Sequence, residues 1–195
     1  MSLRDRKKER TRRAIADAAL RLFVEHGYDA VTVADIAAEA DVGTRTLHRY
    51  YPSKDELLFA EDDEHRAELA RLLAARPAEE SPEETMAAVI GPLVERFGDR
   101  LVDMRARDAL IAATPALQAR ELAKRNAVES LLAEHLARRM GVEVGTDVRP
   151  LLWAKVGMAS FFAGYEIWLN TGGDLGSHIS DARAALLTEV RSAAI

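Results

Sequence analysis

The spacing of apolar residues predicts an all-α protein of about nine helices. Alanine, leucine, arginine and glutamate dominate the 195 residues, and these residue types favour helices. No segment shows the alternation of apolar and polar residues that is typical of a strand. With 48% hydrophobic and 30% charged residues, the composition is that of an ordinary globular protein. We expect a small N-terminal domain followed by a larger helical one.

The first helix is predicted from about Arg10 to Gly27. Apolar residues recur there at i, i+3 and i+4, and a glycine after the last of them is a typical helix stop. Residues 4–13 contain seven Lys or Arg and only two acidic residues, although the whole chain has a net charge of −5. Such a basic segment is what phosphate binding requires. A solvated helix end has the same composition, so both interpretations stay open.

Two short helices separated by a turn follow the first helix. Thr32 can cap the first of them, from about Val33 to Glu39, and Asp35 completes a capping box. The second ends at about Tyr50, because Pro52 pushes the residue before it towards extended geometry. Two short helices joined by a tight turn behind a longer helix form a helix-turn-helix arrangement.

The segment from Val42 to Leu57, VGTRTLHRYYPSKDEL, is rich in hydrogen-bonding side chains. Residues near the start of a recognition helix reach the edges of DNA bases, and hydroxyl and basic side chains bind phosphates. The side chains that are not needed for packing, and are left for such a role, are Thr44, Arg45, Thr46, His48 and Arg49.

The remainder of the chain is predicted to be entirely helical. Ser53 and Glu56 form a second capping box, which predicts a fourth helix from Ser53 to about Ala75. Ser81 and Glu84 form a third such box, with proline at the first helical position. The later helices are predicted at Arg100 to Ala113, Ala116 to Met140, Asp147 to Asn170, and from about Ser177 onwards.

Several function classes find no support in the sequence. The absence of cysteine excludes disulfides, thiolate nucleophiles and cysteine zinc sites. No nucleophile elbow, phosphate-binding glycine loop or HExxH motif is present, so we expect neither an enzyme nor a cofactor. The acidic run from Glu61 to His65 offers metal-binding oxygens, but on a helix they point in several directions, and no metal site is expected. The apolar run from Val156 to Leu169 contains Glu166 and is too short to span a bilayer, which predicts a cytoplasmic protein.

Residues 10–58 closely resemble the DNA-binding domain of the tetracycline-repressor (TetR) family of bacterial regulators. The matching words are IADAALRLFVEHGYDAVTVADIAAEADV and TLHRYYPSKDELL. Residues 59–195 match the family only in length and helical character. The resemblance implies a helix-turn-helix DNA-binding domain at residues 1–55 and a helical domain for effector binding and dimerisation at residues 56–195.

The resemblance also implies how such a protein works. A homodimer, paired through its last two helices, lays the third helix of each subunit in the major groove of a palindromic operator. It usually represses transcription until a small molecule bound in the larger domain releases it. A ligand-dependent activator and a corepressor-dependent regulator remain alternatives. A helical module that binds only another protein is a further one, but it leaves the polar segment unexplained.

Carried over by position, the resemblance implies a set of DNA contacts. Asp41 replaces a glycine common in the family's turn, and aspartate tolerates a left-handed conformation. His48 stands where tyrosine is typical, so its contact would be weaker or would depend on pH. Tyr51 could either pack or bind a phosphate, and Arg45 could read a guanine or bind a phosphate. The base-reading positions are Gly43, Thr44 and Arg45, and the phosphate-binding positions are Thr32, Thr46, His48, Tyr50 and Lys54.

The larger domain offers candidates for the effector site. Methionines and aromatic residues suit apolar cavities, although each is equally compatible with an ordinary core. Glu166 could pair with a cationic ligand or point to solvent. Gly157, Ser160 and Gly164 lie one turn apart, which favours close helix packing, either across a dimer or within one subunit. The candidates are Met86, Phe97, Met104, Leu117, Trp153, Phe161, Phe162, Tyr165 and Glu166.

Overall fold

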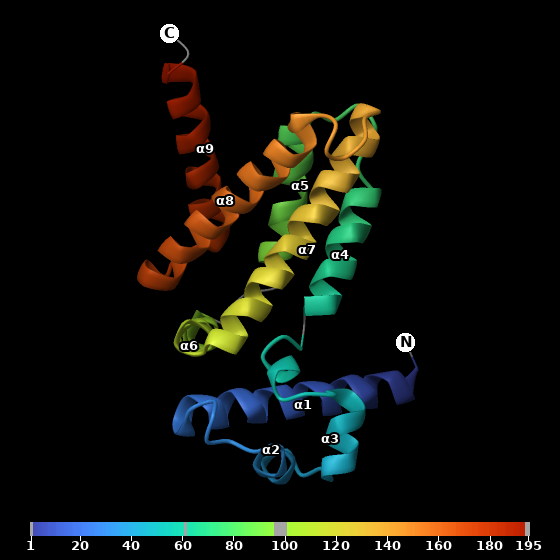
Figure 1. Ribbon diagram of the computed structural model, residues 1–195, viewed down its shortest axis with the longest axis vertical. Coiled ribbons are helices and arrows are strands. Elements are labelled where there is room, and N and C mark those ends of the chain that lie inside the picture. Colours follow the sequence, from blue (N-terminus) through green and yellow to red (C-terminus); the bar gives the residue numbers. More distant parts are fainter. Residues whose placement is uncertain (1, 61, 96–100, 194–195) are drawn as a thin grey trace. The chain divides into compact units, whose positions relative to one another are not determined.

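The computed structural model describes residues 2–60, 62–95 and 101–193. Within these ranges the chain contains nine α-helices and no β-strand, as predicted. The elements, drawn in Figure 1, are α1 (Leu3–His26), α2 (Val33–Glu39), α3 (Thr44–Tyr50), the 3₁₀ helix η1 (Asp55–Leu57), α4 (Asp62–Ala74), α5 (Pro82–Val94), α6 (Leu101–Ala113), α7 (Pro115–Met140), α8 (Val148–Thr171) and α9 (Leu175–Ala193).

The chain packs as two compact units, each with its own core. The first unit combines Met1–Asp63 with Val102–Glu121, and the second combines Glu64–Leu101 with Leu122–Ile195. The division expected between residues 55 and 56 is a functional one and stays a prediction. The core of the first unit includes Ile15, Phe23, Ile36, Leu47, Leu57, Phe59, Ile111 and Leu117. The core of the second includes Leu69, Leu73, Met86, Val89, Leu132 and Ala154.

Most of the predicted helix starts are confirmed. The Thr32 side chain accepts a hydrogen bond from the backbone N–H of Asp35, and Ser81 does the same for Glu84. Asp147 caps α8 by accepting from the backbone N–H that lies two residues further on. These caps depend on residues two or three positions apart, so a sequence pattern can identify them.

The first helix begins earlier than predicted. Ser2 and Asp5 form a capping box that starts α1 at Leu3, so the predicted start near Arg10 is wrong. The basic segment therefore forms the first turns of the helix, and its Lys and Arg residues at positions 4–8 are exposed. Its end at Gly27, with φ of 84°, is as predicted.

The predicted fourth helix is interrupted. Ser53 hydrogen-bonds Asp55 instead of capping a long helix, η1 covers one turn, and α4 begins only at Asp62. The physical reason is the apolar run Leu57, Leu58 and Phe59, whose side chains are all buried in the first unit's core. Successive residues of an α-helix point about 100° apart, so a continuous helix could not place all three in one core.

The small residues of α8 serve packing within the chain. A Cβ at Gly164 would lie 2.5 Å from the backbone N and Cα of Ile179, so α9 packs directly against the α8 backbone there. A Cβ at Gly157 would lie 2.0 Å from Cε of Met86 on α5, and Ser160 is buried. Of the two interpretations left open by the sequence, the one within the subunit accounts for these positions.

Candidate nucleic-acid interface

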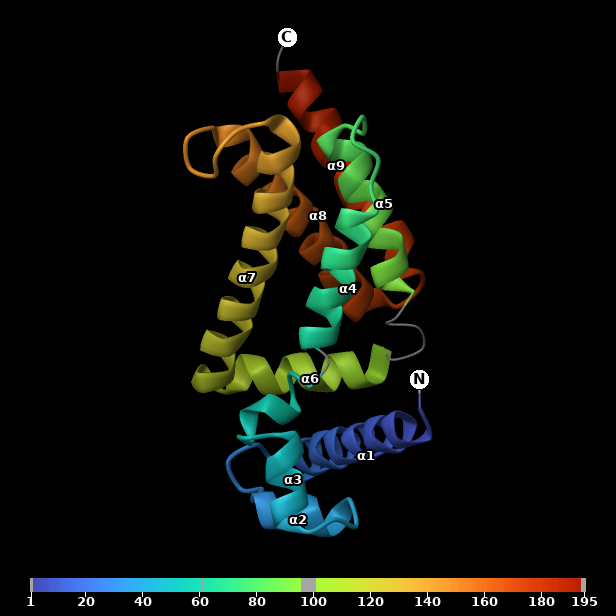
Figure 2. The ribbon, with the colours of Figure 1, turned by 90° about the vertical axis from the view of Figure 1, so that its right-hand side faces the viewer.

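The turn between α2 and α3 holds the two helices in a defined orientation. Asp41 adopts the left-handed conformation with φ of 53°, as its sequence position allowed. The N–H of Asp41 donates to the carbonyl of Ala38 at 3.2 Å, and the N–H of Val42 donates to the carbonyl of Ala37 at 2.9 Å. These two bonds form a Schellman motif, in which the last carbonyls of α2 find hydrogen-bond donors in the turn. Figures 1 and 2 show α2 and α3 side by side against α1.

α3 turns one apolar residue inward and a polar face outward. Leu47 is fully buried in the core of the first unit. Thr44, Arg45 and His48 are exposed, and so is Gly43, which precedes the helix. On a helix, Arg45 lies almost opposite Leu47, so the packing of Leu47 directs the predicted base-reading side chain to solvent.

The other predicted residues of α3 are less exposed. Thr46 and Tyr50 are half-buried, and Tyr50 packs beneath Arg49, whose guanidinium lies 5.5 Å from the centre of the tyrosine ring. Arg49 is exposed on the same side of the helix as Arg45. α3 therefore presents the guanidinium groups of Arg45 and Arg49 to solvent. Thr46 and Tyr50 lie beside this exposed face and are only partly accessible.

Thr32 is exposed at the start of α2, but its side chain is already engaged. Its hydroxyl donates to the Asp35 carboxylate at 2.6 Å and accepts from the Asp35 N–H at 3.2 Å. The bonds from the Thr32 hydroxyl and backbone N–H lower the pKa of Asp35. A phosphate at this position would have to compete with the Asp35 carboxylate for the hydroxyl proton.

Tyr51 has a structural role. Its side chain is 2% exposed, and its hydroxyl donates to the backbone carbonyl of Arg12 at 3.0 Å. The backbone is extended at this residue, as expected before Pro52. Of the two roles that the sequence left open, packing is the one that the structure supports. The bond ties the end of α3 to the middle of α1.

Lys54 is half-buried and holds the loop between α1 and α2. Its ammonium donates to the carbonyls of Tyr28 at 2.7 Å and Val31 at 3.1 Å. The same group lies 4.1 Å from the centre of the Tyr28 ring, within the range of a cation–π interaction. The predicted position at the start of a fourth helix is wrong, since Lys54 precedes the 3₁₀ turn η1. Its phosphate contact stays a prediction.

A long-range link within the first unit was not foreseen from the sequence. On α6, Arg107 donates from Nε to the carbonyl of Leu58 at 2.9 Å. At the start of α7, Arg120 pairs with Asp55 at 2.9 Å. Burial of Asp55 opposes its ionisation, but hydrogen bonds from Ser53 and from its own backbone N–H, with the charge of Arg120, lower its pKa overall. No local pattern connects residues so distant in the chain.

The candidate effector residues are distributed over both units. Phe97 lies outside the described residues, and Met104 and Leu117 are buried in the first unit. Glu166 is exposed, which agrees with the solvent-facing alternative. The remaining candidates belong to the second unit and are Met86, Trp153, Phe161, Phe162 and Tyr165.

An aromatic cluster runs along α8 in the second unit. Phe161 and Phe162 are half-buried, with ring centres 5.4 Å apart in an edge-to-face arrangement. Tyr165 is buried and lies 6.0 Å from Phe161 and 5.7 Å from Trp168. The guanidinium of Arg125 on α7 lies 3.8 Å from the centre of the Phe162 ring. Three of the predicted effector residues are therefore brought together.

Two other kinds of site are absent from the described ranges. No group of three or more His, Asp or Glu side chains in these ranges is arranged to hold a metal ion. None of the described helices combines the length and the hydropathy that a membrane span needs.

Comparisons with known proteins agree with the arrangement of the first unit. A family model described as "Bacterial regulatory proteins, tetR family" matches residues 15–60. A second, described as "MftR C-terminal domain", matches residues 79–191, which is more than half of the chain.

Individual proteins show the same similarity. A Mycobacterium tuberculosis protein named as a mycofactocin biosynthesis transcriptional regulator, MftR, is 31% identical over 84% of this chain and 82% of its own. The HTH-type transcriptional regulator TcmR of Streptomyces glaucescens is 32% identical over 76% of this chain and 68% of its own. The crystal structure of Thermus thermophilus FadR with lauroyl-CoA shares the fold, with a TM-score of 0.55, 24% identity, and coverage of 90% of this chain and 93% of that one. The chain therefore belongs to the TetR family of bacterial transcriptional regulators, and it is a DNA-binding regulator of transcription.

Proposed function

We propose that this chain is a cytoplasmic repressor that binds a palindromic operator as a homodimer and is released by a small-molecule effector. Residues 1–55 carry DNA recognition, and residues 56–195 carry dimerisation and effector binding. The observation that supports DNA recognition best is the polar face of α3. Buried Leu47 anchors the helix, while Thr44, Arg45 and His48 remain exposed.

The proposed contacts divide into base reading and phosphate binding. Arg45 is exposed and sits in the first turn of α3, where a guanidinium can contact a guanine in the major groove with two hydrogen bonds. Phosphate contacts set the register of the protein on the duplex but carry no sequence information directly. The base-reading set is Gly43, Thr44 and Arg45, and the phosphate-binding set is Thr32, Thr46, His48, Tyr50 and Lys54.

The basic start of α1 adds a second source of phosphate affinity. Arg4, Arg6, Lys7 and Lys8 are exposed in the first two turns of the helix. Cations are unfavourable at a helix N-terminus because the macrodipole is positive there. Helix stability therefore does not explain these residues, whereas attraction to DNA phosphates does.

The proposed dimer uses the last two helices. α8 carries large apolar side chains that are exposed in the single chain, among them Leu152 and Ile167 at about half of their surface. Exposed apolar patches commonly mark interaction sites, and two-fold pairing of identical chains matches the symmetry of a palindromic operator.

The proposed effector site lies in the second unit. Its candidate residues are aromatic or flexible, which suits an organic molecule with apolar parts. The T. thermophilus protein that shares this fold is described as a repressor bound to lauroyl-CoA. The residues proposed to contact the effector are Met86, Trp153, Phe161, Phe162, Tyr165 and Glu166.

The proposal is tested by selecting binding sites from a randomised DNA library. The purified full-length chain is incubated with the library at about 150 mM salt, which suppresses binding through phosphates alone, and the bound fraction is sequenced. We expect enrichment of a two-fold symmetric site. Enrichment only after addition of a metabolite extract would indicate a corepressor, and enrichment in neither condition would refute the DNA-binding assignment.

The direction of regulation needs a separate measurement. The selected site is placed over a promoter that drives a reporter, and expression is compared with and without the protein. Reduced expression supports a repressor, whereas increased expression from an upstream site supports the activator alternative.

A further inference from the structure

His135 on α7 is a buried polar residue that the proposed DNA-binding function does not use. Only 8% of its surface is exposed, and its Nε2 atom is buried without a hydrogen-bond partner. Buried polar atoms in proteins are nearly always hydrogen-bonded, and burying one without a partner is unfavourable. His135 therefore retains one buried ring nitrogen whose hydrogen bond is not supplied by the described residues.

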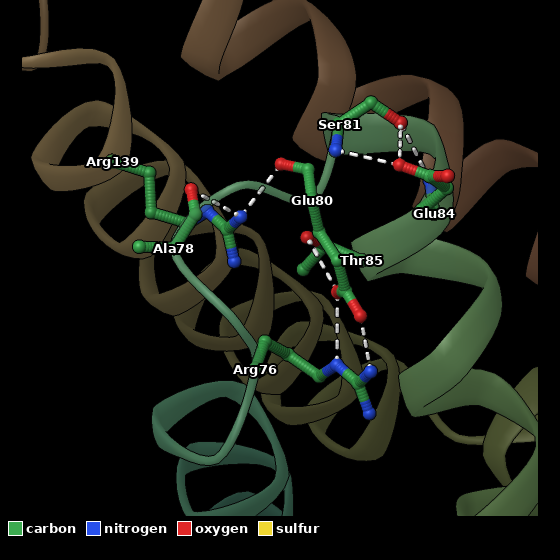
Figure 3. Close-up of polar contacts among 7 residues, drawn as sticks. All are labelled: Arg76, Ala78, Glu80, Ser81, Glu84, Thr85 and Arg139. Atoms are coloured by element: carbon green, nitrogen blue, oxygen red, sulfur yellow. Dashed lines mark hydrogen bonds and ion pairs between the residues drawn. The ribbon is translucent and has the colours of Figure 1, made fainter.

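Arg139 stands one turn further along the same helix. Residues four apart lie on the same face of an α-helix. Its Nη2 atom donates to the carbonyls of Ala78 at 3.0 Å and Glu80 at 2.6 Å, and these are the dashed lines drawn from Arg139 in Figure 3. Its Nη1 atom is buried and has no partner. Two neighbouring side chains therefore each retain a nitrogen that can still form a hydrogen bond.

Arg139 forms no ion pair with the carboxylate of Glu80. Glu80 accepts Arg139 only through its backbone carbonyl, because its carboxylate is held by Arg76 in an ion pair and also accepts the Thr85 hydroxyl at 3.4 Å (Figure 3). Hydrogen bonding from Arg76 is the main cause of the lowered pKa of Glu80. The charge of Arg139 also lowers the pKa of Glu80, but the carboxylate forms its ion pair with Arg76 and leaves Nη1 of Arg139 without a hydrogen-bond partner.

The buried residues beside His135 on α7 are apolar, whereas Glu134 and Arg138 of the same stretch are exposed. Leu132 and Leu136, one turn before His135 and beside it in sequence, are buried. Leu132 belongs to the core of the second unit together with Leu69 and Met86. A ligand that reaches His135 would therefore meet hydrocarbon side chains next to two hydrogen-bonding nitrogens.

We propose that His135 and Arg139 bind an anionic oxygen group, a carboxylate or a phosphate, carried by an effector that also has an apolar part. Arg139 supplies the positive charge and a donor from Nη1, and His135 supplies a second donor from Nε2. Burial, and then the charges of Arg139 and Arg138, lower the pKa of His135. Only a ring nitrogen that carries a proton donates a hydrogen bond, so this role of His135 requires a proton on Nε2. The inference rests on the proposed effector function of the second unit.

The test uses three probes with the same apolar chain and different head groups: octanoate, octyl phosphate and 1-octanol. The full-length chain is labelled with ¹³C and ¹⁵N in its five histidines, and His135 is assigned from the spectrum of His135→Gln. We expect octanoate or octyl phosphate to shift the His135 imidazole signals, and whichever binds more tightly identifies the head group. 1-Octanol should bind at least tenfold more weakly, because it lacks the charge that Arg139 attracts.

Substitutions separate a ligand contact from a packing role. His135→Leu keeps an apolar side chain in place but removes the donor, and it should weaken binding of the anionic probe about tenfold, the effect of losing one hydrogen bond to a charged group. His135→Gln retains a donor and should bind more tightly than His135→Leu. His26→Gln, at an exposed histidine of α1, is the matched control and should bind as the original chain does.

Several outcomes would overturn the inference. It fails if neither anion shifts the His135 signals, if 1-octanol binds as tightly as the anions, or if His135→Leu binds the anions unchanged. DNA binding is measured separately on the same preparation with the selected operator. A chain that binds its operator without responding at His135 refutes only this inference, whereas a chain that binds no DNA refutes the proposed function.

Discussion

Gly164→Ala is expected to destabilise the second unit by forcing α8 and α9 apart. The added Cβ would lie 2.5 Å from the backbone N and Cα of Ile179 and 2.7 Å from the carbonyl carbon of His178. These are backbone atoms of α9, so no side-chain rotation can remove the overlap. α9 must shift along part of its contact with α8.

The magnitude follows from two opposing effects. Overpacking a well-packed site costs about 1 to 3 kcal/mol, while alanine stabilises a helix interior by about 0.5 to 1 kcal/mol relative to glycine. We therefore expect a net loss of about 0.5 to 2 kcal/mol. For a protein of this length, such a loss lowers the Tm by about 1 to 8 °C.

Gly157→Ala is the matched control in the same helix. Its Cβ would overlap only Cε of Met86, at 2.0 Å, and this atom is the far end of a flexible side chain that can move aside. Its effect on Tm should be small, since the gain in helix propensity offsets the repacking of Met86.

Both variants are compared with the original chain by thermal unfolding, followed by circular dichroism at equal protein concentration. The concentration is held constant because the proposed dimerisation would make the Tm depend on it. If Gly164→Ala unfolds at or above the Tm of Gly157→Ala, then α9 does not approach the α8 backbone as closely as described, and the reasoning fails.

Four further predictions concern DNA binding and stability. Arg45→Ala should lose about 1 to 3 kcal/mol of discrimination at one base position; an unchanged sequence preference in the library selection would remove Arg45 from the base-reading set. Lys54→Met removes the hydrogen bonds from the ammonium to the carbonyls of Tyr28 and Val31. It should lower the free energy of unfolding, measured in urea, by about 1 to 3 kcal/mol. Equal stability of the variant and the original chain would show that these bonds do not stabilise the fold. Replacing both Arg4 and Lys8 by Gln should weaken binding to all DNA and reduce the slope of log K against log salt by about one for each phosphate that is no longer neutralised, whereas an unchanged slope would place the start of α1 away from DNA. The pKa of Asp147 is lowered to about 2, chiefly by hydrogen bonding from Arg149, so the contribution of its carboxylate to stability is present above pH 4 and is lost as the pH falls towards 2. Asp147→Asn should therefore be less stable than the original chain at pH 7 but not at pH 2. An equal difference in stability at both pH values would contradict this role.

Most helix boundaries set by neighbouring residues were predicted, although the Ser2–Asp5 capping box that starts α1 was overlooked. Thr32 and Ser81 start helices through partners three residues away, and Gly27 ends one through its own backbone conformation. The orientation of α3 could also be predicted from the sequence, because Leu47 is the buried residue of this seven-residue helix and the opposite side faces solvent. In each case the energetic cause lies within about one helical turn.

Predictions failed where a distant contact competed with a local pattern. Ser53 and Glu56 have the spacing of a capping box, but burial of Leu57, Leu58 and Phe59 in a single core requires the helix to break. Hydrophobic burial of three large side chains outweighs one cap, which contributes only about 1 kcal/mol. The capping pattern at Ser53 is therefore present in the sequence, but its stabilisation is smaller than that of hydrophobic burial.

The residues alone specified the helical class, the helix-turn-helix motif and the polar face of α3, because these depend on periodicity and on short-range hydrogen bonds. Packing assigned the roles that periodicity leaves open. Tyr51 became a core residue with a bond to α1, Lys54 became a clamp on the loop before α2, and Gly164 became the contact point of α9. Each of these roles depends on atoms that are distant along the chain, and only the folded chain brings those atoms together.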